Sequence, residues 1–239
     1  MKRLLLTLLL ALCTSVAAAQ NGWTQAEELY RQGKFSAALS EYENLLKTYP
    51  NNPFVYYNIG NCYFKMGSRG LAVANYYRAF RLNPRQNDIR HNLALALENS
   101  GEKLVPTGVP EVLHRMFFGL STTELQGLTY LLFWLVCIGI LVGLWRRKWS
   151  RLATLICILA ALSTAWWLIR AQGEKELLAV VAAPVAEVRS GPGTNFPASA
   201  NIAQGHLVTI LDGKDTWYEV AISSQGLKGW IEKDAVEKI

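Results

Sequence analysis

The chain has 239 residues, of which 51% are hydrophobic and 18% charged, with a formal net charge of +6 at pH 7. This is more apolar than a soluble globular protein normally is, so we expect the excess to be concentrated in particular segments. No segment that we expect to fold is strongly basic: residues 20–105 carry ten Lys and Arg against seven Asp and Glu, and residues 171–239 carry six against nine. Without a concentrated basic face, nucleic-acid binding is excluded as an expected function.

Residues 1–19 have the pattern of a secretory signal peptide. Lys2 and Arg3 precede a short, largely apolar stretch, and small residues at Ala17–Ala19 precede Gln20. The apolar stretch is too short to span a bilayer comfortably, so we expect export and cleavage, with an uncleaved anchor as the alternative. Of the four cysteines, Cys62 alone lies outside this segment and the two apolar runs described below, which excludes a disulfide framework and favours a buried thiol over a redox role.

Residues 20–105 contain an internal repeat with a period of 34 residues. The spacing recurs for glycine (33, 67, 101), proline (50, 84), alanine (38, 72), tyrosine (42, 76) and asparagine (58, 92). A helical repeat of this period is typical of tetratricopeptide (TPR) repeats, and residues 56–86 resemble the TPR consensus closely. We predict an all-α TPR domain over 20–105, with repeats at about 20–52 and 53–86 and a capping helix over 87–100.

The positions of glycine and proline in the repeat fit pairs of antiparallel helices. Gly33 and Gly67 fall at the turn within each pair, where a residue without Cβ can adopt a positive φ. Pro50 and Pro84 end the second helix of each pair, because the residue before proline avoids the α region. Pro53 suits the first turn of the next helix.

Two long uncharged runs follow a linker. Residues 106–124 hold proline and glycine, a short amphipathic stretch suited to an interface, and helix-start chemistry at Ser121–Glu124. Residues 125–145 and 152–169 carry no charge and are each long enough to cross a bilayer. The short loop between them predicts a transmembrane helical hairpin, in preference to a buried hairpin of a soluble protein.

The loop at 146–151 is strongly basic. Its four cations are Arg146, Arg147, Lys148 and Arg151. Short loops rich in Lys and Arg stay in the cytoplasm, which predicts that both flanks of the hairpin lie on the opposite side. The signal peptide independently predicts export of the segment that follows it.

Residues 177–239 read as a small all-β barrel of about five short strands, separated by turn residues. Three stretches, VRSGPGTNF (188–196), WYEV (217–220) and GWI (229–231), resemble the bacterial Src-homology-3-like (SH3-like) domain. The expected fold class is therefore multidomain: an all-α TPR solenoid, a two-helix transmembrane hairpin and a C-terminal SH3-like barrel.

The order of these segments resembles the Bat-type (BatE-like) proteins of bacterial aerotolerance operons. The resemblance implies partners among membrane proteins with von Willebrand A-type domains and a MoxR-type ATPase system, in an oxidative or envelope-stress setting. The implied location is the bacterial cytoplasmic (inner) membrane, with the TPR and SH3-like domains on the periplasmic side.

Nothing in the sequence predicts catalysis. The three histidines (91, 114 and 206) fall in different segments, without metal-ligand spacing, and no phosphate-binding loop is present. We expect no catalytic residue, metal or cofactor.

Recognition is the expected chemistry instead. The first helices of TPR repeats line a concave groove. The family pattern places eight candidate binding residues in it: Trp23, Tyr30, Arg31, Tyr57, Asn58, Asn61, Phe64 and Lys65. Leu95 is one of the further positions that the pattern places there. Asn58 matches an asparagine that often binds ligand backbone in TPR domains. In the SH3-like segment, Trp217, Tyr218 and Trp230 are candidates for a binding strip. The alternative for all these aromatics is packing in the core.

Two functions follow as alternatives. The first is a membrane-anchored adaptor that recruits protein or peptide partners through both modules. The second is a sensor whose SH3-like domain binds peptidoglycan. An assembly factor that scaffolds membrane proteins through its spans is a third.

Overall fold

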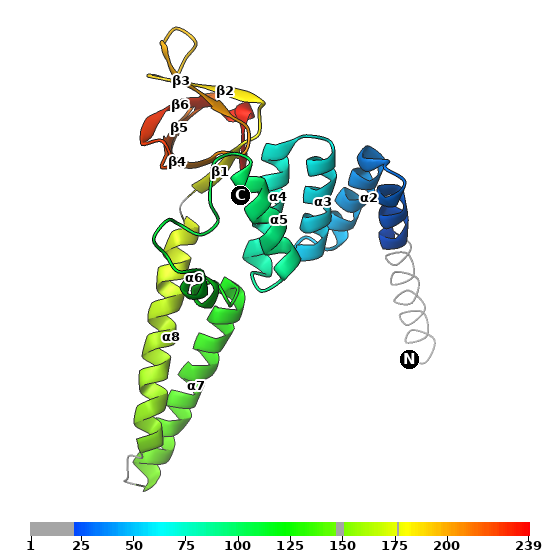
Figure 1. The fold of residues 1–239 in the computed structure, drawn as a ribbon. Coiled ribbons are helices and arrows are strands. Elements are labelled where there is room, and N and C mark those ends of the chain that lie inside the picture. Colours follow the sequence, from blue (N-terminus) through cyan, green and yellow to red (C-terminus); the bar gives the residue numbers. More distant parts are fainter. Residues whose placement is uncertain (1–21, 147–150, 176) are drawn as a thin grey trace, which may run out of the picture.

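The computed structural model describes residues 22–146, 151–175 and 177–239. The described chain forms a helical array, a long two-helix hairpin and a β-domain (Figure 1). The predicted signal peptide and two of the loop cations, Arg147 and Lys148, lie outside the described residues. The predicted fold class is confirmed in its helical repeats, its two apolar helices and its antiparallel β-domain.

The helical array consists of antiparallel helices joined by short turns. Residues 22–31 are helical and are followed by α2 (Phe35–Thr48), α3 (Pro53–Lys65), α4 (Arg69–Leu82) and α5 (Asn87–Glu98). Gly33 and Gly67 adopt φ of 75° and 80°, as predicted for the turn positions. Asn52 caps α3 by accepting hydrogen bonds from the backbone N–H groups of Phe54 (2.9 Å) and Val55 (3.4 Å).

The array has two hydrophobic cores. One lies among the first helices and α2–α3, around Tyr42, Leu45 and Cys62. The other lies between α4 and α5, around Tyr76, Phe80 and Leu93. The repeat therefore places its paired tyrosines, 42 and 76, in equivalent buried positions.

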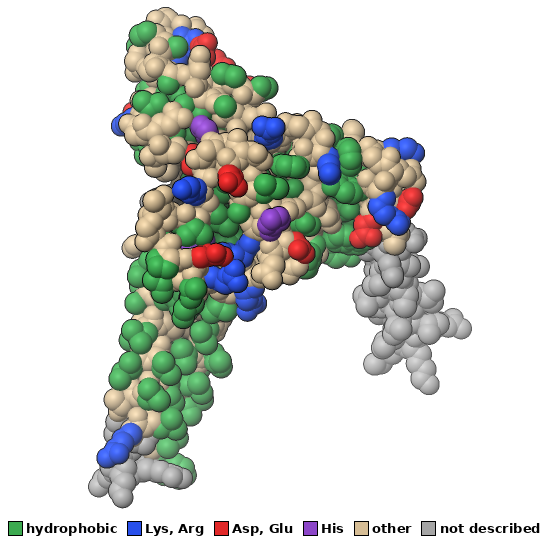
Figure 2. All heavy atoms as spheres, viewed as in Figure 1, with side chains coloured by type: hydrophobic (Ala, Val, Ile, Leu, Met, Phe, Trp, Pro, Cys, Tyr) green, Lys and Arg blue, Asp and Glu red, His purple; other side chains and the backbone are tan. Residues whose placement is uncertain are grey.

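A hairpin of two long helices follows a short helix, α6 (Glu111–Phe117). The hairpin consists of α7 (Thr122–Arg146) and α8 (Arg151–Lys175), which pack against each other. Both are long and apolar enough to cross a membrane, and only 6% and 11% of their apolar windows are buried within the structure. Their hydrophobic side chains form the surface of the hairpin (Figure 2), which is not how the core helices of a soluble protein are placed.

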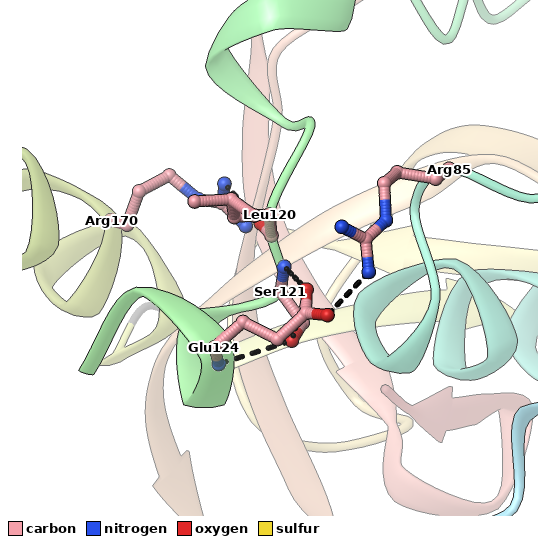
Figure 3. A network of polar contacts seen from close by, with 5 residues as sticks. All are labelled: Arg85, Leu120, Ser121, Glu124 and Arg170. Atoms are coloured by element: carbon pink, nitrogen blue, oxygen red, sulfur yellow. Dashed lines mark hydrogen bonds and ion pairs between the residues drawn. The ribbon is translucent and has the colours of Figure 1, made fainter. Parts of the chain in front are cut away.

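Figure 3 shows how the start of α7 is fixed. The Ser121 backbone N–H donates to Glu124 Oε2 (2.9 Å), and the Glu124 backbone N–H donates to Ser121 Oγ (3.3 Å), which is the reciprocal capping predicted from the sequence. Glu124 also forms an ion pair with Arg85, in the turn before α5. The beginning of the hairpin is thereby tied to the helical array.

The β-domain is one antiparallel sheet with strand order β3-β2-β6-β5-β4-β1-β7. Its elements are β1 (Leu177–Val181), β2 (Val185–Arg189), β3 (Ala198–Ala203), β4 (Leu207–Lys214), β5 (Trp217–Ile222), β6 (Leu227–Glu232), η1 (Lys233–Ala235) and β7 (Val236–Lys238). The sheet has more strands than the five or so predicted from the sequence. Pro184, which has no N–H to donate to a ladder, lies between β1 and β2.

The β-domain packs directly on the helical array (Figure 1). Val180 of β1 is fully buried in the core of α4 and α5, and Leu207 and Ile239 pack against the same core. At Gly70 of α4, an added Cβ would lie 2.2 Å from the Val181 carbonyl oxygen, so the absence of a side chain permits this close approach.

Polar contacts reinforce this interface. Arg78 of α4 forms an ion pair with Glu237 and donates to the Lys238 carbonyl oxygen, and Arg81 donates to the Ile239 carbonyl oxygen (3.2 Å). Ser100 Oγ donates to the Gln204 carbonyl oxygen (3.2 Å). The sequence predicted the two modules on one side of the membrane but not their contact, and in the structure they form one packed unit.

Candidate functional site

A small pocket opens on the inner side of the helical array. Its volume is about 170 Å³, and it is lined by Tyr30, Asn61, Phe64, Lys65, Tyr76, Asn92 and Leu95. Both repeats and the capping helix contribute to the lining. Tyr30 belongs to the first helix of the first repeat (residues 22–31), α3 is the first helix of the second repeat, and α5 is the capping helix. Four of the eight predicted groove residues meet here: Tyr30, Asn61, Phe64 and Lys65.

A hydrogen-bond network fixes the polar wall of this pocket. Asn61 Oδ1 accepts from Tyr76 Oη (2.8 Å) and from Asn92 Nδ2 (3.1 Å). Asn92 Nδ2 also donates to Tyr57 Oη (3.0 Å), and Asn61 Nδ2 donates to Asn58 Oδ1 (3.4 Å). A network held from several helices orients its amides before any ligand arrives, which lowers the entropic cost of binding.

The tyrosines of the pocket are neutral. Burial raises the pKa of Tyr76 and, less strongly, of Tyr30, with nearby ionisable side chains adding to the shift. The charge of the pocket lining comes from Lys65, which is exposed at the rim. Aromatic walls, fixed amides and one rim cation together suit an extended peptide that presents an apolar side chain and backbone polar groups.

The other four predicted groove residues lie behind or away from the pocket. Tyr57 is half-buried, packs on Tyr76 with ring centroids 5.9 Å apart, and joins the network together with Asn58. Trp23 packs edge-on against Tyr42 in the first core. Arg31 is exposed and forms an ion pair with Glu28 of its own helix.

Two lining residues, Tyr76 and Asn92, were not among the predicted site residues. The 34-residue period pairs Asn92 with Asn58, so the repeat itself carried the signal for a second asparagine facing the groove. Tyr76 belongs to a second helix and is mostly in the core; only its hydroxyl reaches the network.

A larger and more acidic pocket lies on the β-domain, with a volume of about 390 Å³. Its polar lining comes from Glu187 and Arg189 of β2, Glu232 of β6 and Asp234 of η1, with Trp217 of β5 as its aromatic wall. Arg189 is held within the domain, because it donates to the carbonyl oxygens of Thr194 (3.2 Å) and Phe196 (2.7 Å) and pairs with Glu187.

The predicted aromatic strip is divided between the two faces of the sheet. Trp217 lines the pocket with only 6% of its surface exposed. Trp230 pairs with Glu219 across β5–β6 and is on the same face as Trp217, outside the pocket lining. Tyr218 faces the core side and has the ammonium groups of Lys233 and Lys238 at 5.0 and 4.8 Å from its ring centroid.

No metal-binding cluster occurs in the described part of the chain: nowhere in it do three His, Cys, Asp or Glu side chains group suitably. Cys62 is fully buried, and burial raises the pKa of its thiol to about 12, so it is a protonated core residue.

Comparison with known proteins identifies the two modules. A TPR repeat family model matches residues 26–67, a tetratricopeptide repeat model matches residues 55–86, and a bacterial SH3 domain model matches residues 184–237. Among curated proteins, mouse protein arginine N-methyltransferase 9 is 33% identical over 67 residues, which are 28% of this chain and 8% of that protein. The chain therefore spans under a tenth of the length of this relative.

Solved structures show partial likeness. The TPR2B-domain:pHsp70 complex of yeast Sti1 is 20% identical, with 34% of this chain and 65% of that chain covered and a TM-score of 0.33. A T3SS complex from Aeromonas hydrophila is 12% identical, with 66% of this chain and 85% of that chain covered and a TM-score of 0.34. On the family models, the chain contains tetratricopeptide repeats and a bacterial SH3 domain, which together support a protein-interaction scaffold role.

Proposed function

We propose that this protein is a membrane-anchored scaffold that binds a peptide segment of a membrane-protein partner in the groove of its TPR repeats. The observation that carries the proposal is the pocket of fixed amides and aromatic rings around Asn61. Hydrogen bonds among its residues fix their positions, and the exposed Leu95 and Lys65 lie at its opening. Such a surface binds a peptide through its shape and through hydrogen bonds to its backbone, without catalysing a reaction on it.

The membrane part of the proposal rests on the hairpin and its basic loop. The apolar surfaces of α7 and α8 are uncovered over a length that matches a bilayer. The four cations at the end of α7, in the connection and at the start of α8 favour a cytoplasmic turn, with both modules on the extracytoplasmic side of the bacterial inner membrane.

The setting that we propose follows from the resemblance to Bat-type proteins. We propose partners among von Willebrand A-type membrane proteins, acting with a MoxR-type ATPase system in aerotolerance or envelope stress. In that complex this chain contributes binding and positioning, and no catalysis.

The groove is tested by placing a charge in it without disturbing the core. Leu95 is 43% exposed and lines the pocket, so Leu95→Glu should leave the fold intact and weaken partner capture at least tenfold, since a carboxylate at this apolar position must be desolvated on binding. The measurement is crosslinking in native membranes followed by mass spectrometry of the partners retained.

Leu211→Glu is the matched control, because Leu211 has similar exposure, 49%, and lies on β4 of the other module. It should retain the partners of the wild type. Equal retention by both variants, with unchanged circular dichroism, would refute the groove as the binding site.

A second function, binding of peptidoglycan, is favoured by the pocket of the β-domain. Its carboxylates at Glu187, Glu232 and Asp234 suit the amino groups of cell-wall peptides. Sedimentation of the solubilised protein with purified sacculi tests this. Retention that is lost in Asp234→Asn would support wall binding, and absence of retention would leave the scaffold as the function of this chain.

A further inference from the structure

A polar cavity of about 580 Å³ lies between α5, the chain after it and α6, away from both pockets described above. Arg90 and His91 of α5, Lys103 of the following segment and Arg115 of α6 line it on the basic side. Glu98, Glu102 and Glu111 line it on the acidic side. Neither the groove nor the β-domain pocket uses any of these residues.

Arg90 is the unusual member of this cavity. Its side chain is 8% exposed, and its Nη1 is buried without a hydrogen-bond partner in the described structure. The guanidinium group lies 5.7 Å from the ring centroid of Phe80, which is its one described aromatic contact. A buried charged donor left unpaired costs free energy, so an arginine kept in this position points to a ligand that satisfies it.

The electrostatics around Arg90 favour an anion. Burial lowers the pKa of Arg90, the neighbouring Arg115 lowers it further, and Glu111 partly offsets both effects. His114 of α6 responds to the same field: burial and Arg90 lower its pKa. An anion between Arg90 and Arg115 would relieve both the desolvation and the repulsion between the two cations.

The carboxylates that line the cavity are either paired with another residue or far from Arg90. Glu111 forms an ion pair with Arg115 (2.8 Å), and Glu102 Oε1 accepts a hydrogen bond from Ser224 Oγ of the β-domain (2.6 Å). Glu98 is eight residues beyond Arg90 on α5, roughly 12 Å along the helix axis at 1.5 Å per residue. The anion-binding end is therefore the end at Arg90, next to α6.

That end lies beside the hairpin. Arg85, just before α5, is paired with Glu124 at the start of α7, and α6 lies at the top of the hairpin (Figure 1). Lys and Arg side chains gather at this junction, directly above the apolar surface (Figure 2). The side chains of Val112, Leu113 and Met116 on α6 are 58–68% exposed, which suits the boundary between headgroups and acyl chains.

We propose that Arg90 and Arg115 bind the phosphate of a phospholipid headgroup whose acyl chains lie along α6 and the apolar hairpin. A guanidinium group matches a phosphate bidentately, and Arg90 has a donor available for it. The site would fix the height of the helical array above the bilayer. The inference rests on membrane insertion of α7 and α8, which is part of the proposed function.

The test uses the full chain, purified in an uncharged maltoside detergent and titrated with phosphatidylglycerol under native mass spectrometry. The wild type should retain one tightly bound lipid. Arg115→Gln, at an exposed position where folding is not at risk, should weaken that binding about tenfold, the equivalent of one charge-assisted hydrogen bond. Arg90→Gln should weaken it at least as much, with thermal unfolding measured alongside.

Arg85→Gln is the matched control, because Arg85 is an exposed arginine at the same junction, paired with a glutamate and outside the cavity lining. It should bind lipid as the wild type does. Equal retention by the wild type and Arg115→Gln would overturn the proposal, and so would displacement of the lipid by millimolar inorganic phosphate, which would assign the site to a soluble anion. Stable incorporation of every variant into lipid nanodiscs separates a failure of this site from a failure of membrane insertion.

Discussion

At Gly70 the backbone of the helical array lies close to the backbone of the β-domain. A Cβ there would meet the Val181 carbonyl oxygen at 2.2 Å and Ala182 Cα at 2.9 Å. Because these are backbone atoms, they cannot rotate away as a flexible side chain would. We expect Gly70→Ala to destabilise the packed unit by about 1–3 kcal/mol through overpacking, more than the roughly 1 kcal/mol that alanine gains in a helix.

Gly173→Ala is the control for this substitution. Gly173 is also helical, but an added Cβ there has nothing within 4 Å. Denaturant unfolding of both variants should show a loss of stability for Gly70→Ala and none for Gly173→Ala. A stabilised Gly70→Ala would mean that the two modules do not pack in this way.

The buried thiol of Cys62 makes stability depend on pH. Its pKa is raised from 9.0 to about 12 by burial, so the folded protein keeps the proton after the unfolded chain has lost it. The stabilisation is fully present below pH 9 and is lost as the pH rises from 9 towards 12. We expect the free energy of unfolding to fall over that range and to fall less steeply in Cys62→Ala.

Burial also raises the pKa of Tyr42, which packs in the same core, so part of the alkaline decline should persist in Cys62→Ala. Cys137→Ala, on α7, should follow the wild-type curve. Parallel curves for all three proteins would show that the thiol is not buried in solution.

The groove shows how far sequence could predict a site. The resemblance to TPR repeats predicted Tyr30, Asn61, Phe64 and Lys65 in one groove, and the structure brings those four to one pocket. Trp23 fits the same pattern but packs on Tyr42, because it lies where the array begins and its ring covers the first core. A pattern specifies which face of a helix a residue occupies, whereas its neighbours decide whether the side chain is needed for packing.

At the scale of elements, Arg170 holds the short helix α6 onto the hairpin. It is 7% exposed, and its Nη1 donates to the carbonyl oxygens of Phe117 (2.9 Å) and Leu120 (3.2 Å), as Figure 3 shows in part. Its guanidinium group also lies 4.5 Å from the ring centroid of Phe118. The Phe117 carbonyl is at the end of α6, where no further helical turn can pair with it, and the Leu120 carbonyl lies in the connection to α7, so Arg170 joins the two.

We expect Arg170→Met to free α6 from the hairpin. Hydrogen bonds to a charged group contribute about 1.5–3 kcal/mol, and the exposed Arg85–Glu124 pair contributes about 0–1 kcal/mol, so the loss should be larger than in Arg85→Met. The measurement is amide hydrogen exchange over residues 111–121 in detergent. Equal protection in both variants would show that α6 is held by its apolar contacts alone.

Element boundaries were predictable where the backbone itself imposes them. The prolines and glycines of the repeat end helices and make turns through steric limits that no neighbour changes, and the predicted turns appear at Gly33 and Gly67. Strand β3 was not predicted, because its sequence ASANIA is small and polar, and its pairing with β2 depends on a partner strand rather than on its own pattern.

At the scale of the whole molecule, the contact between the modules constrains the membrane topology. The helical array precedes the hairpin and the β-domain follows it, yet Val180 is buried in the core of the array. Two segments in such contact must lie on the same side of a membrane, which requires an even number of spans between them, and the chain has two candidate helices there. From the sequence, the basic loop and the signal peptide both predict that the two modules lie on one side of the membrane. The contact itself could not be predicted, since nothing in the pattern of β1 marks it as part of a helical core.

We therefore expect a reporter inserted after residue 105, with the rest of the chain continuing behind it, and a reporter fused after residue 239 to be active in the same compartment. The loop cations should determine which compartment that is. Alkaline phosphatase, which is active only after export, should be active at both positions in the native chain. Replacing Arg146, Arg147, Lys148 and Arg151 by Gln should lower both activities together, because the orientation preference is lost while the modules remain joined. Moving the β-domain alone across the membrane would expose the apolar core around Val180, so one active and one inactive reporter is the result that the packed interface forbids.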